Sequence, residues 1–235
     1  MPEANNGSLP KPYSFDGPVP EGVIQRPVLI SHHPLIQHKI GLLRRKETST
    51  KDFSELASEV AMLLLYEATT DLKLESVQIE TPICEATVMT LAGKSPVLVP
   101  ILRAGLGMYD GIRKLMPQSD IGMIGLYRNE ETREAVRYYS KLPTDSAERP
   151  IFLLDPMLAT GNSACDAMKI LCELGCEPRN VTFICLLAAQ PGLEQMQREY
   201  PEVQIVAGAY DEKLNEQCYI VPGLGDAGDR IFGTK

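Results

Sequence analysis

The segment 151–164, IFLLDPMLATGNSA, places a carboxylate, two hydroxyls and a glycine directly after a short apolar run. The apolar run predicts a strand, and the pattern from Ser163 onward predicts a helix. Free amides at the start of a helix bind phosphate, and the hydroxyls of Thr160 and Ser163 add donors. Asp155 would repel phosphate, so we expect it to accept hydrogen bonds from sugar hydroxyls or to approach a cation. These residues together indicate a site for a phosphorylated ribose; an ordinary strand-to-helix turn is the alternative.

Two other segments have residues suited to a site. In LRAG, 102–105, Arg103 follows a predicted strand and can bind an anion, while Gly105 permits close approach of the backbone. The alternative for Arg103 is a surface ion pair. In YIVPGLGDAGDR, 219–230, frequent Gly and Pro indicate irregular backbone that shapes a pocket or a turn. A P-loop is excluded, because the chain has no G-x-x-x-x-G-K-[ST] sequence.

The spacing of apolar residues along the chain predicts the helices and strands that position these segments. Residues 33–45 and 52–72 have helical spacing, with Asp52 as the expected N-cap of the second helix. Apolar runs then alternate with helical ones: strands at 97–102, 121–127, 151–154, 181–187 and 203–206, and helices at 106–115, 163–174 and 192–200. This alternation predicts an α/β fold with a central, mostly parallel sheet flanked by helices. Ligands bind beyond the carboxyl ends of such strands, where Arg103 and Asp155 are expected.

Two segments lie outside the alternation. Residues 128–143, RNEETREAVRYYSKLP, are charged and polar, and we interpret them as a two-stranded arm. Residues 1–26 are rich in Pro, Gly and Asn, which favours a flexible leader over a packed arm. Residues 27–235 are expected to form one domain. The first residues resemble neither a signal peptide nor a transit peptide, so we expect a cytoplasmic protein.

Composition narrows the classes of function. The chain has 235 residues and a net charge of −8, which disfavours binding to nucleic acid. No apolar run approaches the roughly 20 residues that a membrane span needs. The six cysteines contain no C-x-x-C pair, so we expect buried, reduced thiols and no zinc site.

The segments LLDPMLATGNSA, PILRAGLGM and YIVPGLGDAGDRIFGT together resemble the uracil phosphoribosyltransferases, a family of the type I phosphoribosyltransferases. The resemblance extends from about residue 27 to residue 235. It implies the reaction of uracil with phosphoribosyl diphosphate (PRPP) to give UMP and pyrophosphate, as in pyrimidine salvage. It also implies the type I fold, with residues 128–143 as a flexible hood that closes over PRPP and excludes water.

The resemblance implies roles for individual residues. Arg103 and Arg128 would hold pyrophosphate, and Asp226 would help to take the proton of the base, which makes these three the catalytic candidates. The expected PRPP-binding residues are Arg103, Ala104, Gly105, Arg128, Asp155, Pro156, Met157, Leu158, Ala159, Thr160, Gly161, Asn162, Ser163 and Asp226. The expected uracil-binding residues are Tyr219, Ile220, Gly225, Asp226 and Ala227. Mg²⁺ would arrive on the oxygens of PRPP, with no direct protein ligand.

One departure from the family and several alternatives stay open. Asn162 stands where the family usually carries Gly. Asn is the best substitute if this position needs a left-handed backbone, whereas PRPP binding would be impaired if it needs the absence of a side chain; we expect Asn to be tolerated. The alternative function is a catalytically silent regulatory protein that binds PRPP or a nucleotide, and an RNA-binding relative is a remoter one. The resemblance also implies a homodimer or homotetramer and raises GTP as an allosteric activator. The basic segment 41–53 could hold such an effector, although we expect an exposed loop there.

Overall fold

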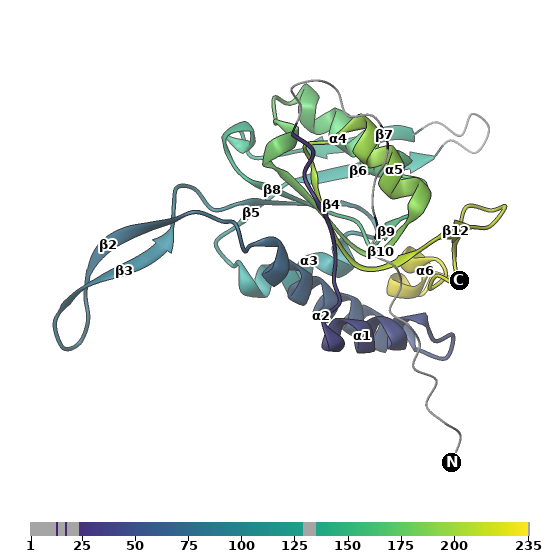
Figure 1. Cartoon of the computed structure of the whole chain (residues 1–235), viewed down its shortest axis with the longest axis horizontal. Coiled ribbons are helices and arrows are strands. Elements are labelled where there is room, and N and C mark those ends of the chain that lie inside the picture. The colour runs from purple at the N-terminus through teal and green to yellow at the C-terminus, as the bar shows by residue number, and fades with distance from the viewer. Residues whose placement is uncertain (1–12, 14–16, 18–23, 129–134, 235) are drawn as a thin grey trace, which may run out of the picture.

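The computed structural model describes Tyr13, Gly17 and residues 24–128 and 135–234. Its centre is a sheet in the order β1-β11-β10-β8-β4-β6-β7, with β5 added beside β4 and β9 beside β10 (Figure 1). The bounds of these strands are β1 (Val28–Ile30), β4 (Val97–Leu102), β5 (Asp120–Ile121), β6 (Met123–Arg128), β7 (Ala135–Lys141), β8 (Ile151–Leu154), β9 (Met157–Leu158), β10 (Val181–Ala189) and β11 (Gln204–Asp211). All of these pairs are parallel except β6–β7. The predicted mostly parallel sheet is confirmed.

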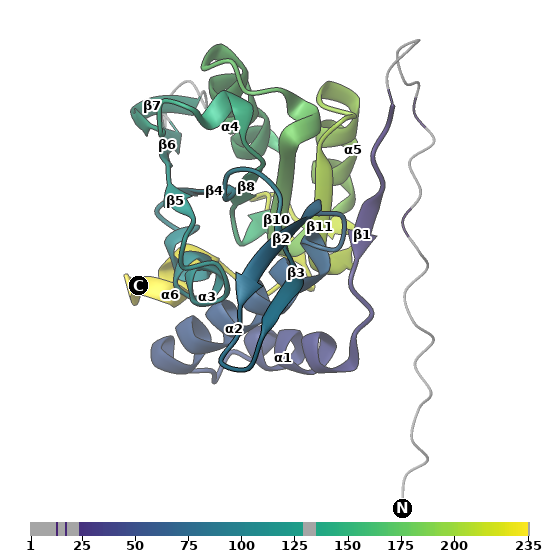
Figure 2. The ribbon, with the colours of Figure 1, turned by 90° about the vertical axis from the view of Figure 1, so that its left-hand side faces the viewer.

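Helices cover both faces of the sheet (Figure 2). They are α1 (Pro34–Arg44), α2 (Thr50–Ala68) and α3 (Leu106–Leu115) on one face and α4 (Asn162–Glu173) and α5 (Gln190–Glu199) on the other, with the short α6 (Ala227–Phe232) packed on α2. Each face therefore has its own apolar core. Leu98 of β4 belongs to the core under α1 and α2, whereas its neighbours Val97 and Val99 belong to the core under α4 and α5. This alternation explains why the central strands are apolar at every position.

Capping side chains define the starts of α1 and α2. His33 caps α1, accepting a hydrogen bond from the amide of Leu35 at 3.2 Å. Ser49 caps α2, because its Oγ accepts from the amide of Asp52 at 3.1 Å. The expectation that Asp52 itself is the N-cap was wrong: Asp52 lies in the first turn and accepts a hydrogen bond from Ser49 Oγ at 2.8 Å. The helix also ends at Ala68, four residues earlier than periodicity indicated.

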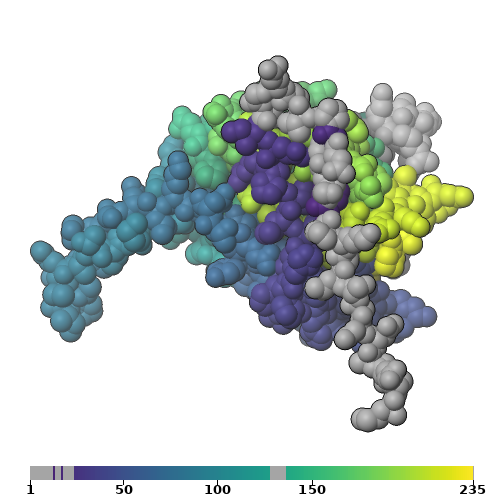
Figure 3. All heavy atoms as spheres, in the orientation of Figure 1, coloured from purple at the N-terminus to yellow at the C-terminus, as the bar shows by residue number. Residues whose placement is uncertain are grey.

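A hairpin of β2 (Leu74–Glu80) and β3 (Glu85–Leu91) projects from the body of the protein (Figures 1 and 3). Periodicity did not predict it. Large apolar side chains on it are exposed, and the most exposed is Ile83, at 91%. The hairpin is joined to the body between α2 and β4. Two shorter strands, β12 (Lys213–Leu214) and β13 (Ile220–Val221), pair near the C-terminus, and two single 3-10 turns lie at Ser146–Glu148 and Pro178–Asn180.

The first part of the chain contacts the domain at two points. The ring of Tyr13 lies 5.8 Å from that of Tyr210, and Arg26 donates hydrogen bonds to Asp71 and Gln204. The other residues of the expected leader, 1–12, 14–16 and 18–23, lie outside the described residues, so its flexibility stays a prediction. Among the residues that the structure describes, no helix is long and apolar enough to cross a membrane.

Candidate active site

Three segments far apart in the sequence meet around a cavity of about 280 Å³ beyond the carboxyl ends of β4 and β8. Its lining comes from the three motifs that the sequence singled out: Ala104; Asp155, Pro156, Met157, Ala159 and Ser163; and Cys218, Tyr219, Ile220, Gly225, Asp226, Ala227 and Gly228. Because β8 pairs directly with β4 in parallel, the segments that follow these two strands lie side by side. The cavity therefore lies where ligands bind in open α/β sheets.

The turn that follows β8 leads directly into α4. Gly161 caps this helix with a left-handed backbone (φ 88°), and α4 begins at Asn162, one residue before the predicted start. The first hydrogen bond within the helix runs from the amide of Cys165 to the carbonyl of Gly161, at 2.9 Å. The amides of the two preceding residues therefore have no acceptor inside the helix and point out of its first turn. Such donors, together with the helix dipole, suit a phosphate.

Asn162 has a right-handed backbone, because Cys218 is the one non-glycine residue with positive φ in the described chain. Of the two conditions considered for Asn162, the left-handed backbone does not apply, because Gly161 occupies that position. Tolerance of the Asn side chain stays a prediction. A Cβ at Gly161 would lie 3.0 Å from the carbonyl oxygen of Gly192. The side chain of Leu158 belongs to the core, and Thr160 Oγ1 accepts from the amide of Asn162 at 3.4 Å.

Asp155 is the partly buried acid of the site. Its residue reaches the cavity, but protein surrounds its carboxyl group, and this burial raises its pKa to about 7; the amide of Met157 opposes the shift by donating to the carboxylate. At neutral pH, the protonated and ionised forms of the Asp155 carboxyl group are therefore both populated. The anion accepts hydrogen bonds from sugar hydroxyls, and a cation or such donors would favour it.

The loop after β4 lies directly over the end of β8. Gly105 is buried, and a Cβ there would come within 2.4 Å of the carbonyl oxygen of Leu154. The glycine therefore lets the loop approach the sheet, and its expected contact with ligand stays a prediction. Arg103 is exposed, and its guanidinium lies 5.8 Å from the ring centre of Phe232 in α6. Ala104 lines the cavity between the turn after β8 and the first residues of α6.

The arm predicted at 128–143 contains one strand among its described residues, β7, which pairs in antiparallel fashion with β6; β6 corresponds to the strand expected at 121–127. Arg128 ends β6 and pairs with Ala135. Because β6 runs parallel to β4, with Leu102 beside Gly125, the backbone of Arg128 lies at the same edge of the sheet as Arg103. The side chain of Arg128 and residues 129–134 lie outside the described residues, so their contact with pyrophosphate stays a prediction.

The C-terminal segment forms one wall of the cavity. Ile220 is buried, and Tyr219 is 40% exposed. The expected base-contacting residues Gly225 and Ala227 line the cavity together with Asp226. Asp226 is the N-cap of α6, and its Oδ1 accepts from the amide of Asp229 at 2.9 Å. Asp226 is thus held in place by the helix that it caps, while it faces the cavity.

Sequence reasoning missed the residues that hold this segment. The guanidinium of Arg44 donates to both carboxylate oxygens of Asp211, at 2.7 and 2.8 Å, and to the carbonyl of Gly223 at 2.8 Å. Asp211 in turn accepts from the amide of Gly223, at 3.0 Å. Arg230 donates to the carbonyls of Leu43 and Leu224, and lies 4.3 Å from the ring centre of Phe53. Asp211 ends an apolar strand, and the same pattern identified Asp155 after its strand; this pattern could therefore have indicated Asp211 as well.

Segment 41–53 covers the end of α1, the loop that follows and the start of α2. Arg44 is committed to Asp211, whereas Arg45, Lys46 and Glu47 lie in the exposed loop between α1 and α2, as expected. The neighbouring cavity of about 420 Å³ is lined by Arg45 and by four acids: Glu47, Asp52, Glu55 and Glu59. This charge is unsuited to a triphosphate.

No cluster of three His, Cys, Asp or Glu side chains able to hold a metal ion occurs in the described chain. Asp155 is followed by Pro156 and not by a second acid, and Asp226 on the opposite segment is the other carboxylate that lines the cavity. This donor set fits an ion that arrives on a phosphorylated ligand better than one held by the protein alone. The expectation of buried cysteines was half wrong: Cys165, Cys176 and Cys185 are buried, but Cys84, Cys172 and Cys218 are exposed.

Comparisons with known proteins agree with this geometry. The sequence model of the family described as uracil phosphoribosyltransferase matches residues 30–234. The uracil phosphoribosyltransferase of Lactococcus lactis subsp. lactis (strain IL1403) is 56% identical over 206 residues, which cover 88% of this chain and 98% of the relative. That of Agathobacter rectalis is 56% identical over 208 residues, covering 88% and 99%. The solved structure of the AQ2163 protein from Aquifex aeolicus is 36% identical, covers 88% and 99% of the two chains, and superposes with a TM-score of 0.82.

Proposed function

The chain belongs to the uracil phosphoribosyltransferase family, and from this premise we propose that it transfers ribose 5-phosphate from PRPP to uracil, releasing pyrophosphate and forming UMP. It is a pentosyltransferase of the type I phosphoribosyltransferase fold, acting in pyrimidine salvage. The single observation that carries the proposal for this site is the meeting of the three motifs around one cavity.

The phosphate and ribose of PRPP would bind at the turn after β8. The free amides at the start of α4 and the hydroxyls of Thr160 and Ser163 donate to the 5′-phosphate. Asp155 lies at the head of the same turn and accepts from the ribose hydroxyls. Asp155 and Ser163 both line the cavity, so the turn would hold one ribose 5-phosphate, with C1 directed to the wall formed by residues 219–228.

The leaving pyrophosphate would lie between β4 and β6. Breaking the bond at C1 builds positive charge on the ribose and negative charge on pyrophosphate, so that fixed donors lower the barrier. Arg103 and Arg128 follow parallel neighbouring strands at the same edge and are the cations proposed for this task. Mg²⁺, when bound, neutralises charge on the pyrophosphate. Residues 128–143, which include β7, are the proposed hood that excludes water from C1.

Uracil would bind against residues 219–228. Backbone N–H and C=O groups of Ile220, Gly225 and Ala227 can match the alternating carbonyls and N–H groups of uracil. Asp226, held as the cap of α6, is the proposed group that accepts the base proton directly or through a water. Cytosine would leave buried partners unmatched, which costs it affinity.

The state and location of the enzyme complete the proposal. We propose a homodimer or homotetramer, supported by the exposed apolar side chains of the β2–β3 hairpin. A cytoplasmic location is supported by the exposed free thiols of Cys84, Cys172 and Cys218, which suit a reducing compartment. GTP remains a proposed activator, but segment 41–53 is no longer the proposed site.

An assay with radiolabelled uracil, PRPP and Mg²⁺ tests the function, with cytosine and orotate as competing bases and each reaction run with and without GTP. We expect kcat/KM for uracil to exceed that for either base by at least about 100-fold. Faster turnover of orotate would overturn the base assignment. The regulatory alternative predicts binding of PRPP without release of pyrophosphate.

A further inference from the structure

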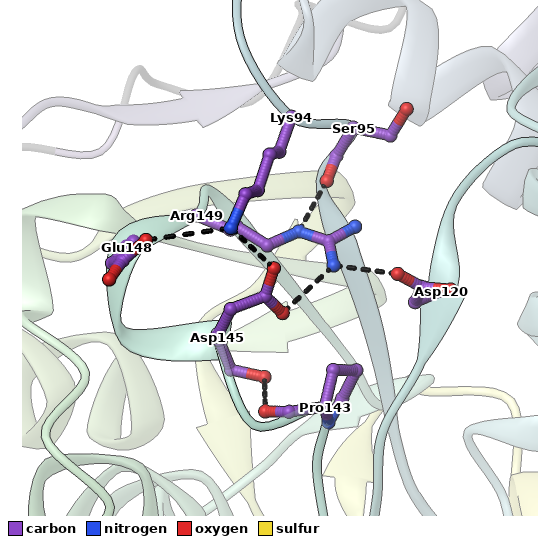
Figure 4. A network of polar contacts seen from close by, with 8 residues as sticks. Lys94, Ser95, Asp120, Pro143, Asp145, Glu148 and Arg149 are labelled. Carbon is purple, nitrogen blue, oxygen red and sulfur yellow. Dashed lines mark hydrogen bonds and ion pairs between the residues drawn. The ribbon is translucent and has the colours of Figure 1, made fainter.

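Arg149 lies just before β8, where the β6–β7 pair joins the rest of the sheet. It is 5% exposed, and its guanidinium is surrounded by acceptors (Figure 4). Nε donates to the carbonyl of Ser95 at 2.7 Å, and Nη1 donates to Asp120 at 2.6 Å and to Asp145 at 3.2 Å. A buried guanidinium is costly unless its donors are used in this way, so its position is closely defined.

The two carboxylates come from opposite ends of the β6–β7 segment. Asp120 begins β5, three residues before β6 starts at Met123. Asp145 follows β7, four residues after that strand ends at Lys141. One guanidinium therefore fixes the chain where it enters the β6–β7 pair and where it leaves it. If the positive charge of Arg149 were removed, the repulsion between the carboxylates of Asp120 and Asp145 would be less well offset.

The same network reaches the chain that leads from the β2–β3 hairpin into β4. Lys94 donates to Asp145 at 2.8 Å and forms an ion pair with Glu148 at 3.5 Å. This contact lowers the pKa of Asp145 and raises that of Lys94, so both groups stay charged over the neutral range. Ser95, which supplies the carbonyl to Arg149, is the next residue. The network thus joins β8, the start of β4 and both ends of the β6–β7 pair.

Packing and charge together hold this end of the β6–β7 pair. Ile124 of β6 is fully buried in the core under α4 and α5, and Leu142, just after β7, packs against the same core. An open groove of about 830 Å³ lies beside the network and is lined by Met123, Tyr139 and Arg149, among others. The charged contacts of Arg149 therefore add to the packing that places the pair.

We propose that Arg149 is a positioning residue for the reaction: it holds the β6–β7 pair, and with it Arg128, at the height of the pyrophosphate site beyond β4. The proposal rests on the proposed function, because it takes Arg128 as a pyrophosphate ligand. Arg149 itself lies near the amino end of β8, and Asp155 follows the carboxyl end of that strand, so Arg149 does not touch the reacting atoms.

Steady-state kinetics of Arg149→Met test the proposal. We expect KM for PRPP to rise about tenfold or more, because small displacements of a group that binds the reacting part have effects of this size. KM for uracil should stay within about twofold, since the uracil wall is held separately by Arg44 and Asp211. Arg149→Lys, which keeps the charge but not the three-way contact, should give an intermediate KM for PRPP.

Asp120→Asn provides a second test that does not endanger folding, because the Asp120 side chain is 61% exposed. It should raise KM for PRPP in the same direction, and hydrogen exchange should be faster at the amides of β6 and β7 but unchanged in β10. Arg137→Met is the matched control: it removes an exposed ion pair between β7 and Glu173 and should leave both KM values unchanged.

Unchanged KM for PRPP in folded Arg149→Met and Asp120→Asn would overturn the proposal, as would equal changes for PRPP and uracil. Failure of the wild-type enzyme to use uracil and PRPP would instead overturn the proposed function. A fall in kcat alone, with both KM values constant, would place the effect on the chemical step and not on PRPP binding, and would contradict the predicted rise in KM for PRPP.

Discussion

Arg44 and Asp211 form a bidentate ion pair that holds both the N–H and the C=O of Gly223. Arg44 ends α1 and Asp211 ends β11, so the pair connects two rigid elements to the irregular segment that forms the uracil wall. Gly223 has a left-handed backbone, and a Cβ there would lie 2.0 Å from the carbonyl oxygen of Ile220. The shape of the proposed base site thus depends on a charged pair outside the cavity.

Breaking this pair should therefore impair uracil binding. For Asp211→Asn or Arg44→Met we predict a rise of about tenfold or more in KM for uracil, with KM for PRPP within about threefold, because the PRPP turn is held by other contacts. Removing one partner of a largely buried pair should also lower the free energy of unfolding by about 3 kcal/mol. Kinetics with each substrate and urea denaturation measure these effects. Arg45→Met, in the adjacent exposed loop, is the control; equal effects in all three variants would contradict the role of the pair.

Asp155 should release a proton when the ribose binds. Its pKa of about 7 in the ligand-free protein falls when hydroxyl donors and a cation favour the anion. Calorimetry of PRPP binding at pH 6.5, in two buffers with different protonation enthalpies, should show more proton release for the wild type than for Asp155→Asn. Subtracting the proton release of Asp155→Asn from that of the wild type removes the protons that PRPP itself loses. Equal release by both proteins would contradict the assignment of Asp155 to the ribose.

The same group should make stability depend on pH. Because the folded-state pKa of Asp155 is raised above the ordinary 3.8, its contribution to stability is fully present below about pH 4 and is lost as pH rises to about 7. Relative to Asp155→Asn, the ligand-free wild type should lose on the order of 2–4 kcal/mol across this range. Urea denaturation from pH 4 to pH 7.5 measures the difference. A difference that is constant with pH, or that grows in favour of the wild type, would contradict the burial of the carboxyl group.

Gly161 and Asn162 should respond oppositely to substitution. Gly161→Ala places a Cβ in a left-handed backbone next to the Gly192 carbonyl, so we predict a rise of about tenfold or more in KM for PRPP. Asn162→Gly changes a right-handed first helical residue, and KM for PRPP should stay within about threefold. A large gain in PRPP affinity for Asn162→Gly would show that the Asn side chain obstructs the phosphate.

The β2–β3 hairpin should determine the oligomeric state. Ile79 and Ile83 are exposed on it, and charged residues in their place would oppose burial against another subunit. Sedimentation of the wild type should give the mass of a dimer or larger assembly, and the double variant Ile79→Glu, Ile83→Glu should sediment as a monomer. Gln78→Glu adds charge at a polar position as the control. A wild-type monomer at micromolar concentration would contradict the assembly.

The parts of the fold that sequence predicted well are those where periodicity and burial agree. The bounds of β4, β8 and α3 match the expected ranges, because each is apolar throughout or on one stripe. Arg103 and Asp155 follow the two strands, and Pro117 lies two residues after the end of the helix. The β2–β3 hairpin was missed because most of its side chains are exposed, which leaves no inside-outside pattern to read. The short α6 was hidden among glycines, and its start depends on the cap made by Asp226.

The candidate site followed from sequence where its residues are contiguous. Asp155 and the turn into α4 could be assigned from local order alone, since the end of a strand and the start of a helix fix them. Arg44, Asp211 and Arg149 could not, because each acts on a segment that is distant in sequence, and only the folded chain brings the partners together. The residue with the left-handed backbone is Gly161, because α4 begins at Asn162, one residue before the predicted start.

A crystal structure with UMP bound tests the central claim most directly. The account predicts that the phosphate contacts the amides at the start of α4, that the ribose hydroxyls contact Asp155, and that the base faces residues 219–228. UMP bound in any other place, or bound in this cavity with its phosphate away from the turn, would contradict it.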